Sequence, residues 1–278
     1  SDAVTGQEMA AWSISAPQYA LPANISQTSS TAVMHSKLPT GYMVVYDASV
    51  QGPVTSVVAN SGNLSFNLSS ATSIGMPISG SGSVTIANSG PITLTGNNSY
   101  TGGTIINSGS SLIAGSNNAI GSGSVTSNGT SSSPANFSTS SGVVMPSLNV
   151  TGGTTAILSD ISTTGTQSYT GNLIIGTSGT GTTTLLSSNA NILIDATING
   201  AVNKVESLVI DAGTGVVNLG GSIGEVARLN NLTVTGSRIN ILADIITGIT
   251  QTYNGAIYIG DASYLGKTPT VGFLFTDN

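Results

Sequence analysis

The chain has 278 residues with only five basic and eleven acidic side chains, one histidine and no cysteine, and its formal net charge is −6. So few scattered basic residues exclude a nucleic-acid-binding patch, because phosphate binding needs clustered Lys and Arg. Without cysteine there are no disulfides or thiolate metal sites, and no apolar run approaches the roughly 18 residues of a membrane helix. We therefore expect no cofactor and no direct membrane insertion of this segment.

Residues 1–50 stand apart from the rest of the chain. They contain Trp12, His35 and three of the nine prolines, and they are predicted to be an N-terminal cap or flexible segment, since a solenoid must cover its terminal coil. A lone histidine in such a segment favours a structural or solvated role over catalysis, because a nucleophilic triad needs its base beside the other members. The first thirty residues lack the basic and apolar regions of a signal peptide.

Residues 51–278 repeat one short strand pattern, separated by turns rich in Gly, Asn and Ser. Ten apolar-x-apolar anchors recur at a mean spacing of about 21 residues, which is typical of a solenoid. The prediction is an all-β, right-handed parallel β-helix of about ten coils, with the anchors stacked in one sheet. A β-sandwich would show similar local strand spacing. The anchors begin at Leu64, Val84, Ile105, Val125, Leu148, Leu173, Ile192, Leu208, Leu232 and Ile257.

Two longer segments refine this prediction. Residues 127–142 (SNGTSSSPANFSTSSG) lie between two anchors and are predicted to form an extruded loop. Residues 148–176 align without a gap to residues 232–260, at an offset of 84. Because 84 is four steps of 21, the alignment predicts that whole coils were duplicated and that both copies follow the same path.

Residues 92–126 carry a motif that reads L-x-G-x-N-x-Y-x-G-x-T, followed by a strand, a Leu and a Gly-Ser-Gly turn. The motif residues are Leu94, Gly96, Asn98, Tyr100, Gly102, Thr104, Leu112, Gly121 and Gly123. This segment resembles the passenger-associated repeat of bacterial autotransporters, and residues 217–236 are similar to coils of filamentous-haemagglutinin-like adhesins. The resemblance implies a right-handed β-helix, export across a Gram-negative outer membrane and an adhesive surface role. It also implies a membrane barrel after the passenger, whereas the chain ends at Asn278, which indicates a fragment or a relative with another secretion route.

Acidic residues are the remaining candidates for catalysis, because pectin-degrading β-helices use carboxylates on adjacent coils. Asp195 and Asp211 each follow an apolar triplet, and neighbouring coils could bring them together. The structural interpretation is that each closes a turn with its side chain. Asp160 and Asp244 are equivalent positions of the duplicated block, and their recurrence favours a scaffold role. No carboxylate is therefore assigned to catalysis or to a metal.

Three tyrosines occupy the same slot of the repeat, Tyr100, Tyr169 and Tyr253. They could stack sugars, but their spacing puts them several coils apart, so packing at a coil corner is the favoured interpretation. Rows of Thr suggest an ice- or mineral-binding face, which the irregular recurrence of Thr disfavours.

The sequence predicts a non-enzymatic bacterial surface or secreted protein, an autotransporter-type passenger fragment acting as an adhesin or display rod. Its expected partner is a host-cell component, an extracellular-matrix component or a glycan. The alternative is a polysaccharide-active enzyme of the pectate lyase or glycosidase type on the same scaffold. The expected location is extracellular or on a Gram-negative cell surface.

Overall fold

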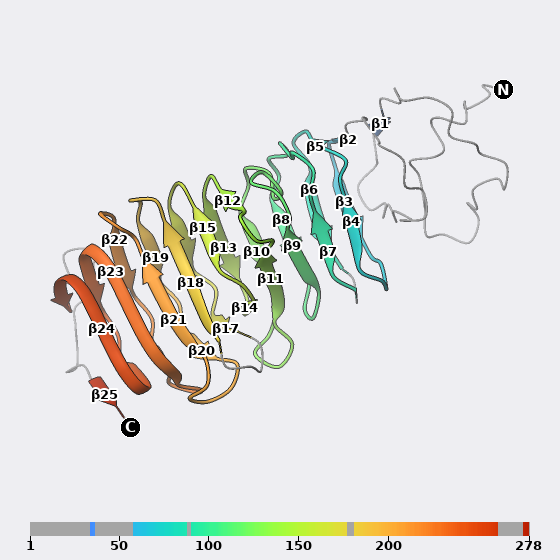
Figure 1. Ribbon diagram of the computed structural model, residues 1–278. Helices are drawn as coiled ribbons and strands as arrows, with labels where there is room; N and C mark the ends of the chain where they lie inside the picture. The colour runs from blue at the N-terminus through green and yellow to red at the C-terminus, as the bar shows by residue number, and fades with distance from the viewer. Residues whose placement is uncertain (1–33, 37–57, 88–89, 177–180, 261–274, 278) are drawn as a thin grey trace, which may run out of the picture. The chain divides into compact units, whose positions relative to one another are not determined.

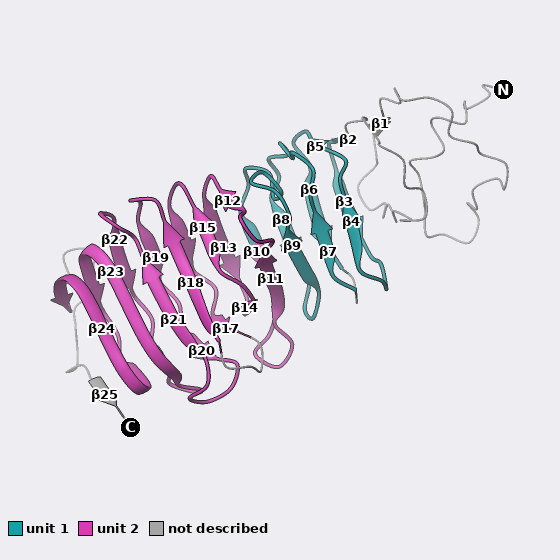
Figure 2. Ribbon diagram, viewed as in Figure 1, with its two compact units in different colours: residues 1–125 teal, residues 126–278 magenta. Residues whose placement is uncertain are grey.

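The computed structural model describes residues 34–36, 58–87, 90–176, 181–260 and 275–277 (Figure 1). It divides into two compact units, residues 1–125 and 126–278 (Figure 2). The described residues contain strands, bridges and turns but no helix, and accordingly no helix among them could cross a membrane. They wind into a parallel β-solenoid of about ten turns, so the all-β parallel β-helix predicted from the repeat is confirmed.

Each turn of the solenoid has three sides, which we call sides A, B and C in chain order. Most strands pair in parallel with a strand one turn away along the chain, so each side is a ladder. In unit 1 the strands are, on side C, β1 (Met34–Ser36), β2 (Val58–Asn60) and β5 (Ile78–Ser79); on side A, β3 (Asn63–Phe66), β6 (Ser83–Ile86) and β8 (Thr104–Ile106); and on side B, β4 (Thr72–Ile74), β7 (Ile92–Leu94) and β9 (Ser111–Ala114).

Unit 2 has the same order of sides. Strand β10 (Val125–Ser127) spans the boundary between the units. Side A holds β13 (Leu148–Gly152), β16 (Gln167–Tyr169), β19 (Ile192–Ile194) and β22 (Val216–Leu219); side B holds β11 (Ala135–Thr139), β14 (Thr155–Ile157), β17 (Leu173–Ile175) and β20 (Ile198–Gly200); side C holds β12 (Val144–Met145), β15 (Ile161–Thr163), β18 (Thr182–Ser187) and β21 (Ser207–Asp211).

The last two strands of unit 2 are long enough to turn corners. Strand β23 (Leu229–Ile241) pairs with β21 on side C through residues 232–235 and with β22 on side A through residues 238–241. Strand β24 (Ile245–Ile259) begins on side B and then follows β23 along sides C and A, and β25 (Phe275–Asp277) pairs with its first residues.

The core consists of the alternate side chains that point into the solenoid. On side A of unit 2, Leu148, Gln167, Ile192, Val217 and Ile239 are successive register partners, and each is at most 1% exposed. Side chains in a strand alternate between its two faces, so apolar-x-apolar triplets bury two residues and present the middle one outward. The stack of buried side chains links each turn to its neighbours, as expected for a solenoid.

The sequence anchors do not all lie in one stack, which corrects that prediction. Leu64 and Val84 pair on side A of unit 1, and in unit 2 the side-A ladder includes Leu148 and Ile192. Leu173, however, lies on side B, and Leu208 pairs with Leu232 on side C. All three sides use the same apolar-x-apolar triplet, so the sequence pattern alone does not distinguish them.

The duplicated block shows the consequence. Leu148 begins β13 on side A, whereas its equivalent Leu232 pairs with β21 on side C. Four turns from Leu148 end at Ile239, which is 91 residues further on rather than 84. The prediction of a duplication in whole coils is therefore wrong, although strands still fall on strands throughout the block.

The prediction of an extruded loop at residues 127–142 is also largely wrong. Residues 135–139 form β11 in the side-B ladder, and Phe137 is fully buried. Only the turns on either side of β11 carry exposed Ser, Thr, Asn and Gly residues. Residues 127–142 are mostly polar, so the alternation of the buried residues Ala135 and Phe137 was not recognised as a strand pattern.

The predicted N-terminal cap at residues 1–50 lies outside the described residues, apart from β1. His35 belongs to this strand, opposite Ala59 of β2 in a parallel pair.

Candidate functional site

The structure separates the two carboxylates that neighbouring coils could have brought together. Asp195 follows β19 on side A, whereas Asp211 ends β21 on side C. Asp211 Oδ1 accepts a hydrogen bond of 2.8 Å from the backbone N–H of Gly213. This bond closes the turn after β21, which is the structural interpretation of this residue.

Asp160 and Asp244 lie at different corners of the solenoid, because Asp160 precedes a strand of side C and Asp244 precedes a strand of side B, but both keep their place relative to the next strand. Each is exposed and lies one residue before a strand, β15 and β24 respectively. Asp160 Oδ1 accepts a hydrogen bond of 2.7 Å from the backbone N–H of Thr184 in the next turn. The carboxylate therefore joins two turns of the scaffold, a common use of Asp in turns.

The repeated tyrosines are packing residues in two of three cases. Tyr100 and Tyr169 are fully buried, and burial raises the pKa of both phenols well above the usual value of about 10. The Tyr100 hydroxyl lies 2.5 Å from Thr104 Oγ1, which is close enough for a hydrogen bond. Tyr169 donates to Gln167 Oε1 at 2.7 Å, and Tyr253 donates to Gln251 Oε1 at 2.8 Å. The duplicated block thus repeats its local contacts, and its tyrosines form no surface ladder for sugars.

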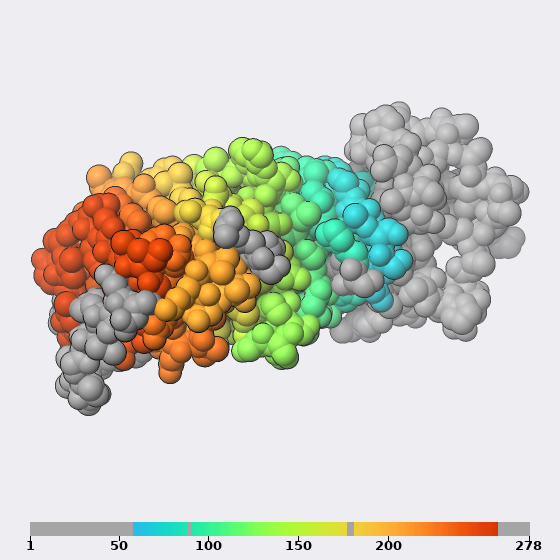
Figure 3. Space-filling model, turned by 60° about the horizontal axis from the view of Figure 1, so that its bottom comes forward, coloured from blue at the N-terminus to red at the C-terminus, as the bar shows by residue number. Residues whose placement is uncertain are grey.

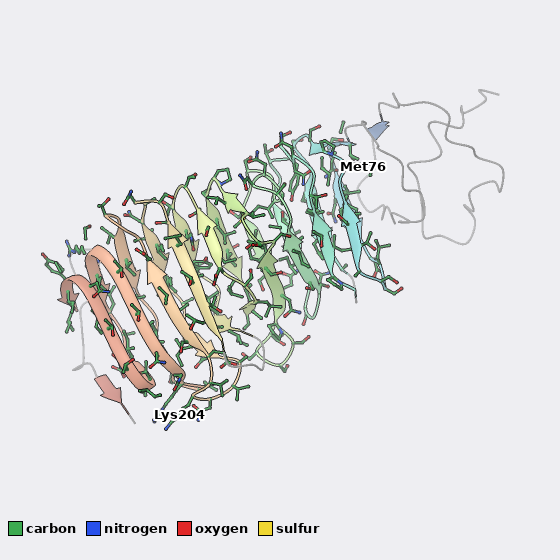
Figure 4. The ribbon with its side chains drawn as sticks, in the orientation of Figure 1. Met76 and Lys204 are labelled. Atoms are coloured by element: carbon green, nitrogen blue, oxygen red, sulfur yellow. The ribbon has the colours of Figure 1, made fainter. Side chains whose placement is uncertain are left out.

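A corner is the connection between two sides of a turn. Two successive corners between sides B and C of unit 2 form a structured protrusion, which we call the B–C corner cluster. It consists of residues 201–206, between β20 and β21, and residues 224–228, before β23. The cluster contains Lys204, Glu206, Glu225 and Arg228, and so a large share of the ionisable side chains that the structure describes. Figure 4 labels Lys204 at the outer edge of this corner.

Two asparagines hold the corners together by accepting backbone hydrogen bonds. Asn199 Oδ1 accepts from the N–H groups of Val226 and Ala227 at 2.9 and 3.0 Å. Asn203 Oδ1 accepts from the N–H of Arg228 at 3.0 Å, and the Lys204 N–H donates to the Arg228 carbonyl at 2.7 Å. Asn and Asp suit this task because a short side chain can bond to the backbone of a turn. The corner therefore has a defined shape.

A buried carboxylate supports the same corner from inside. Glu206 is 1% exposed, and its Oε2 and Oε1 accept from the Val202 N–H at 3.0 and 3.2 Å. Its backbone carbonyl accepts from the Asn230 N–H at 2.6 Å. A buried charged group must be hydrogen-bonded to be tolerated, so these contacts fix the path of residues 202–206.

The outside of the B–C corner cluster combines apolar and charged side chains. Val226 is 85% exposed and Val202 is 38% exposed, and Glu225 accepts a hydrogen bond of 3.0 Å from the Ser222 hydroxyl. The surface of unit 2 around these corners is coloured orange in Figure 3. A rigid backbone with exposed apolar side chains and charges of both signs is suited to binding.

A second polar feature crosses the outer surface of side A in unit 2. Asn218 Nδ2 donates to Asp195 Oδ1 at 2.8 Å, and Asn240 Oδ1 accepts from Arg238 Nε at 2.7 Å. The Arg238 guanidinium lies 4.0 Å from the centroid of the Tyr258 ring. Asn218 and Asn240 are register partners. This row therefore crosses four turns. It runs from exposed Asp195 to exposed Tyr258 through the buried side-chain amides of Asn218 and Asn240.

Neither feature was found from the sequence. The signals were present: the turn from Gln167 to Ile192 and the turn from Ile192 to Val217 each take 25 residues, which leaves extra residues for corners. The charged residues after position 200 also contrast with the uncharged stretch before Asp160. The side on which each residue lies depends on the register, which the repeat did not provide.

The class defined by these observations is a parallel β-solenoid whose second unit carries a structured corner and an outer polar row. The described residues contain no group of three or more His, Cys, Asp or Glu side chains placed to hold a metal ion. No family model, curated protein or solved structure matches this chain.

Proposed function

We propose that this protein is a non-enzymatic bacterial adhesin, an autotransporter-type passenger segment that is secreted or displayed on the surface of a Gram-negative cell. Its partner is a host-cell component, an extracellular-matrix component or a glycan. The β-solenoid supports this proposal together with the passenger-like motif, whose Tyr100 and Leu112 are buried core residues. Such a scaffold holds its corners rigidly while their sequences vary.

The observation that carries the proposal is how the carboxylates are used. Asp160, Asp195 and Asp211 accept hydrogen bonds that join turns or close them, and they lie on different sides or corners of the solenoid. Glycoside hydrolysis commonly needs two carboxyl groups about 5–10 Å apart across a bound sugar. Hydrogen bonds within the scaffold favour a structural use of these three carboxylates.

The B–C corner cluster is the surface that we assign to binding. Its backbone is fixed by Asn199, Asn203 and Glu206, so little conformational entropy is lost when a partner binds. Val226 supplies an exposed apolar contact, and Lys204 and Arg228 supply positive charge around it. Single contacts of this size are weak, and display of many copies on a cell multiplies their effect.

A binding experiment tests the proposal directly. The purified protein is applied to glycan and extracellular-matrix arrays and to cultured cells, beside the variants Val226→Asp and Leu186→Asp. Leu186 is 38% exposed in β18, away from the cluster, and serves as the matched control. We expect binding by the wild type, loss with Val226→Asp and retention with Leu186→Asp. Equal binding by both variants would show that the cluster is not the binding surface. Absence of binding by the wild type would contradict the adhesin proposal.

The alternative is a polysaccharide-active enzyme, and one observation favours it: Asp195, Arg238 and Tyr258 share the outer surface of side A. Incubation with pectin-type and other polysaccharides, followed by a reducing-end and an unsaturated-product assay, distinguishes the two functions. We expect no sugar release. Release that disappears with Asp195→Ala or Arg238→Ala would establish the enzyme.

A further inference from the structure

The outer face of side C in unit 2 brings together threonines that recur irregularly in the sequence. Strands β18, β21, β23 and β24 lie side by side there (Figure 1), and every second side chain of each strand points outward. The twelve outward residues form three rows across the strands, which we call the side-C face. The central row is Thr184, Val209, Thr233 and Thr252, and the flanking rows are Thr182, Ser207, Asn231 and Thr250, and Leu186, Asp211, Thr235 and Asn254.

The central row offers hydroxyl groups that the protein does not use itself. The hydroxyls of its three threonines make no hydrogen bond with another residue that the structure describes. One flanking row is held by bonds of its own, since Asn231 Nδ2 donates to Ser207 Oγ at 3.1 Å and Thr250 Oγ1 donates to Asn231 Oδ1 at 2.8 Å. Threonine is stiff at χ1 because it is β-branched. The central row therefore presents methyl and hydroxyl groups at fixed positions.

The composition of the side-C face limits what it can bind. Asp211 is the one ionisable residue among the twelve, and its carboxylate already accepts from the Gly213 N–H. A mineral surface or a charged partner would require many charges of one sign. None of the twelve residues is aromatic, so the face has no ring on which a sugar could stack. It is suited to a neutral ligand that makes repeated hydrogen bonds.

We propose that the side-C face binds ice. In ice each water oxygen has four tetrahedral neighbours at the usual O–H···O distance of about 2.75 Å, which places next-nearest oxygens about 4.5 Å apart and gives a repeat of about 7.3 Å along the hexagonal axis. Neighbouring strands of a ladder are about 4.8 Å apart, and alternate residues of one strand are about 6.7 Å apart. Both spacings of the face are thus within about a tenth of the spacings of the lattice.

The mismatch stays small over the whole face. Across four strands, three steps of the ladder differ from three steps of the lattice by about 1 Å. Rotation of a threonine hydroxyl and of the water bound to it is sufficient to absorb this difference. The side-C face shares no residue with the B–C corner cluster, so this inference goes beyond the proposed function and does not depend on it.

Partition into slowly growing ice tests the proposal. The fraction of protein taken into the ice is measured together with the thermal hysteresis, the gap between the melting and freezing points of a single crystal. We expect the wild type to enter the ice and Thr233→Tyr, which places a bulky ring in the centre of the face, to be excluded. Thr93→Tyr, at the outward position of β7 on side B of unit 1, is the matched control and should behave as the wild type. Exclusion of the wild type, or equal losses with both variants, would overturn the proposal.

Val209 gives a second test, because it lies between two threonines of the central row. Val209→Thr completes the row with nearly the same side-chain shape, so thermal hysteresis should be kept or increased, whereas Val209→Tyr should abolish it. Circular dichroism verifies that each variant is folded. Loss of activity with Val209→Thr would contradict the proposal.

A polysaccharide is the competing ligand for a flat face of hydroxyl groups. Powdered cellulose and chitin are therefore incubated with the same variants. Retention that Thr233→Tyr abolishes, with exclusion of the wild type from ice, would assign the side-C face to a polysaccharide and overturn the proposal. The adhesin proposal is tested separately by Val226→Asp, so failure of one is distinguishable from failure of the other.

Discussion

At the scale of single residues, Glu206 combines deep burial with charge. Its carboxylate accepts from the Val202 N–H on the inner surface of the B–C corner cluster. We expect Glu206→Ala to lower the free energy of unfolding by about 1–3 kcal/mol, because the partly buried Val202 N–H loses its carboxylate acceptor. Urea denaturation measures the change. Glu206→Gln keeps an acceptor oxygen and should cost less, and Glu225→Ala, at an exposed position, should cost little.

The duplicated block provides a matched pair of tyrosines. Tyr169 and Tyr253 make the same hydrogen bond to a glutamine two residues earlier, but Tyr169 is fully buried and Tyr253 is half-buried. We expect Tyr169→Phe to cost about 1–3 kcal/mol, because Gln167 Oε1 loses its donor in the core. Tyr253→Phe should cost less, since water can replace the bond. Equal losses in urea denaturation would show that burial does not set the difference.

The same burial predicts how stability depends on pH. Burial raises the pKa of Tyr100 and Tyr169 in the folded chain, while in the unfolded chain both titrate near the usual value of about 10. Above that value the unfolded state binds fewer protons than the folded state, so stability falls as pH rises. We expect a lower urea midpoint at about pH 11 than at about pH 8. Absorbance at the tyrosinate wavelength should show both phenols ionising only on unfolding.

At the scale of elements, the corners between sides B and C depend on asparagine side chains. Asn199 accepts two backbone N–H groups from the neighbouring corner. We expect Asn199→Ala to speed hydrogen exchange at Val226 and Ala227 and to lower stability by about 0.5–1.5 kcal/mol, because water can reach the released N–H groups. Exchange in β14 and β17, on the same side but in earlier turns, should be unchanged. Slow exchange at Val226 in the variant would show that the corner keeps its shape without the hydrogen bonds to Asn199.

The elements also show how much of the structure is predictable from the sequence. The apolar-x-apolar triplets predict the strands and the class of fold, because Val84 and Ile86 pack inward as their alternation requires. The same triplets occur on all three sides, so they place Leu173 and Leu208 in the wrong ladder. Turns of 19 and 25 residues follow one another at Gln167, and a mean period cannot locate such changes. The polar row from Asp195 to Tyr258 depends on that register and is therefore not predictable from the repeat.

At the scale of the whole molecule, a solenoid is stabilised by contacts between successive turns, so damage should stay local. Leu94 is fully buried in β7 of unit 1. We expect Leu94→Ala to cost about 2–5 kcal/mol and to remove hydrogen-exchange protection from β7 and β9. Protection in β19, β21 and β22 of unit 2 should remain. Simultaneous loss of protection in both units would mean that the chain unfolds as one cooperative body.

The second copy of the duplicated block, residues 232–260, begins on a different side from the first copy. This has a consequence for how such a chain grows during evolution. Residues 148–176 and 232–260 are 84 positions apart, which the structure resolves into eleven sides, one fewer than four full turns. We infer that a gene segment encoding one strand and one corner can be gained or lost in evolution, because the next side accepts the same triplet. The unit of growth is then the side rather than the whole turn.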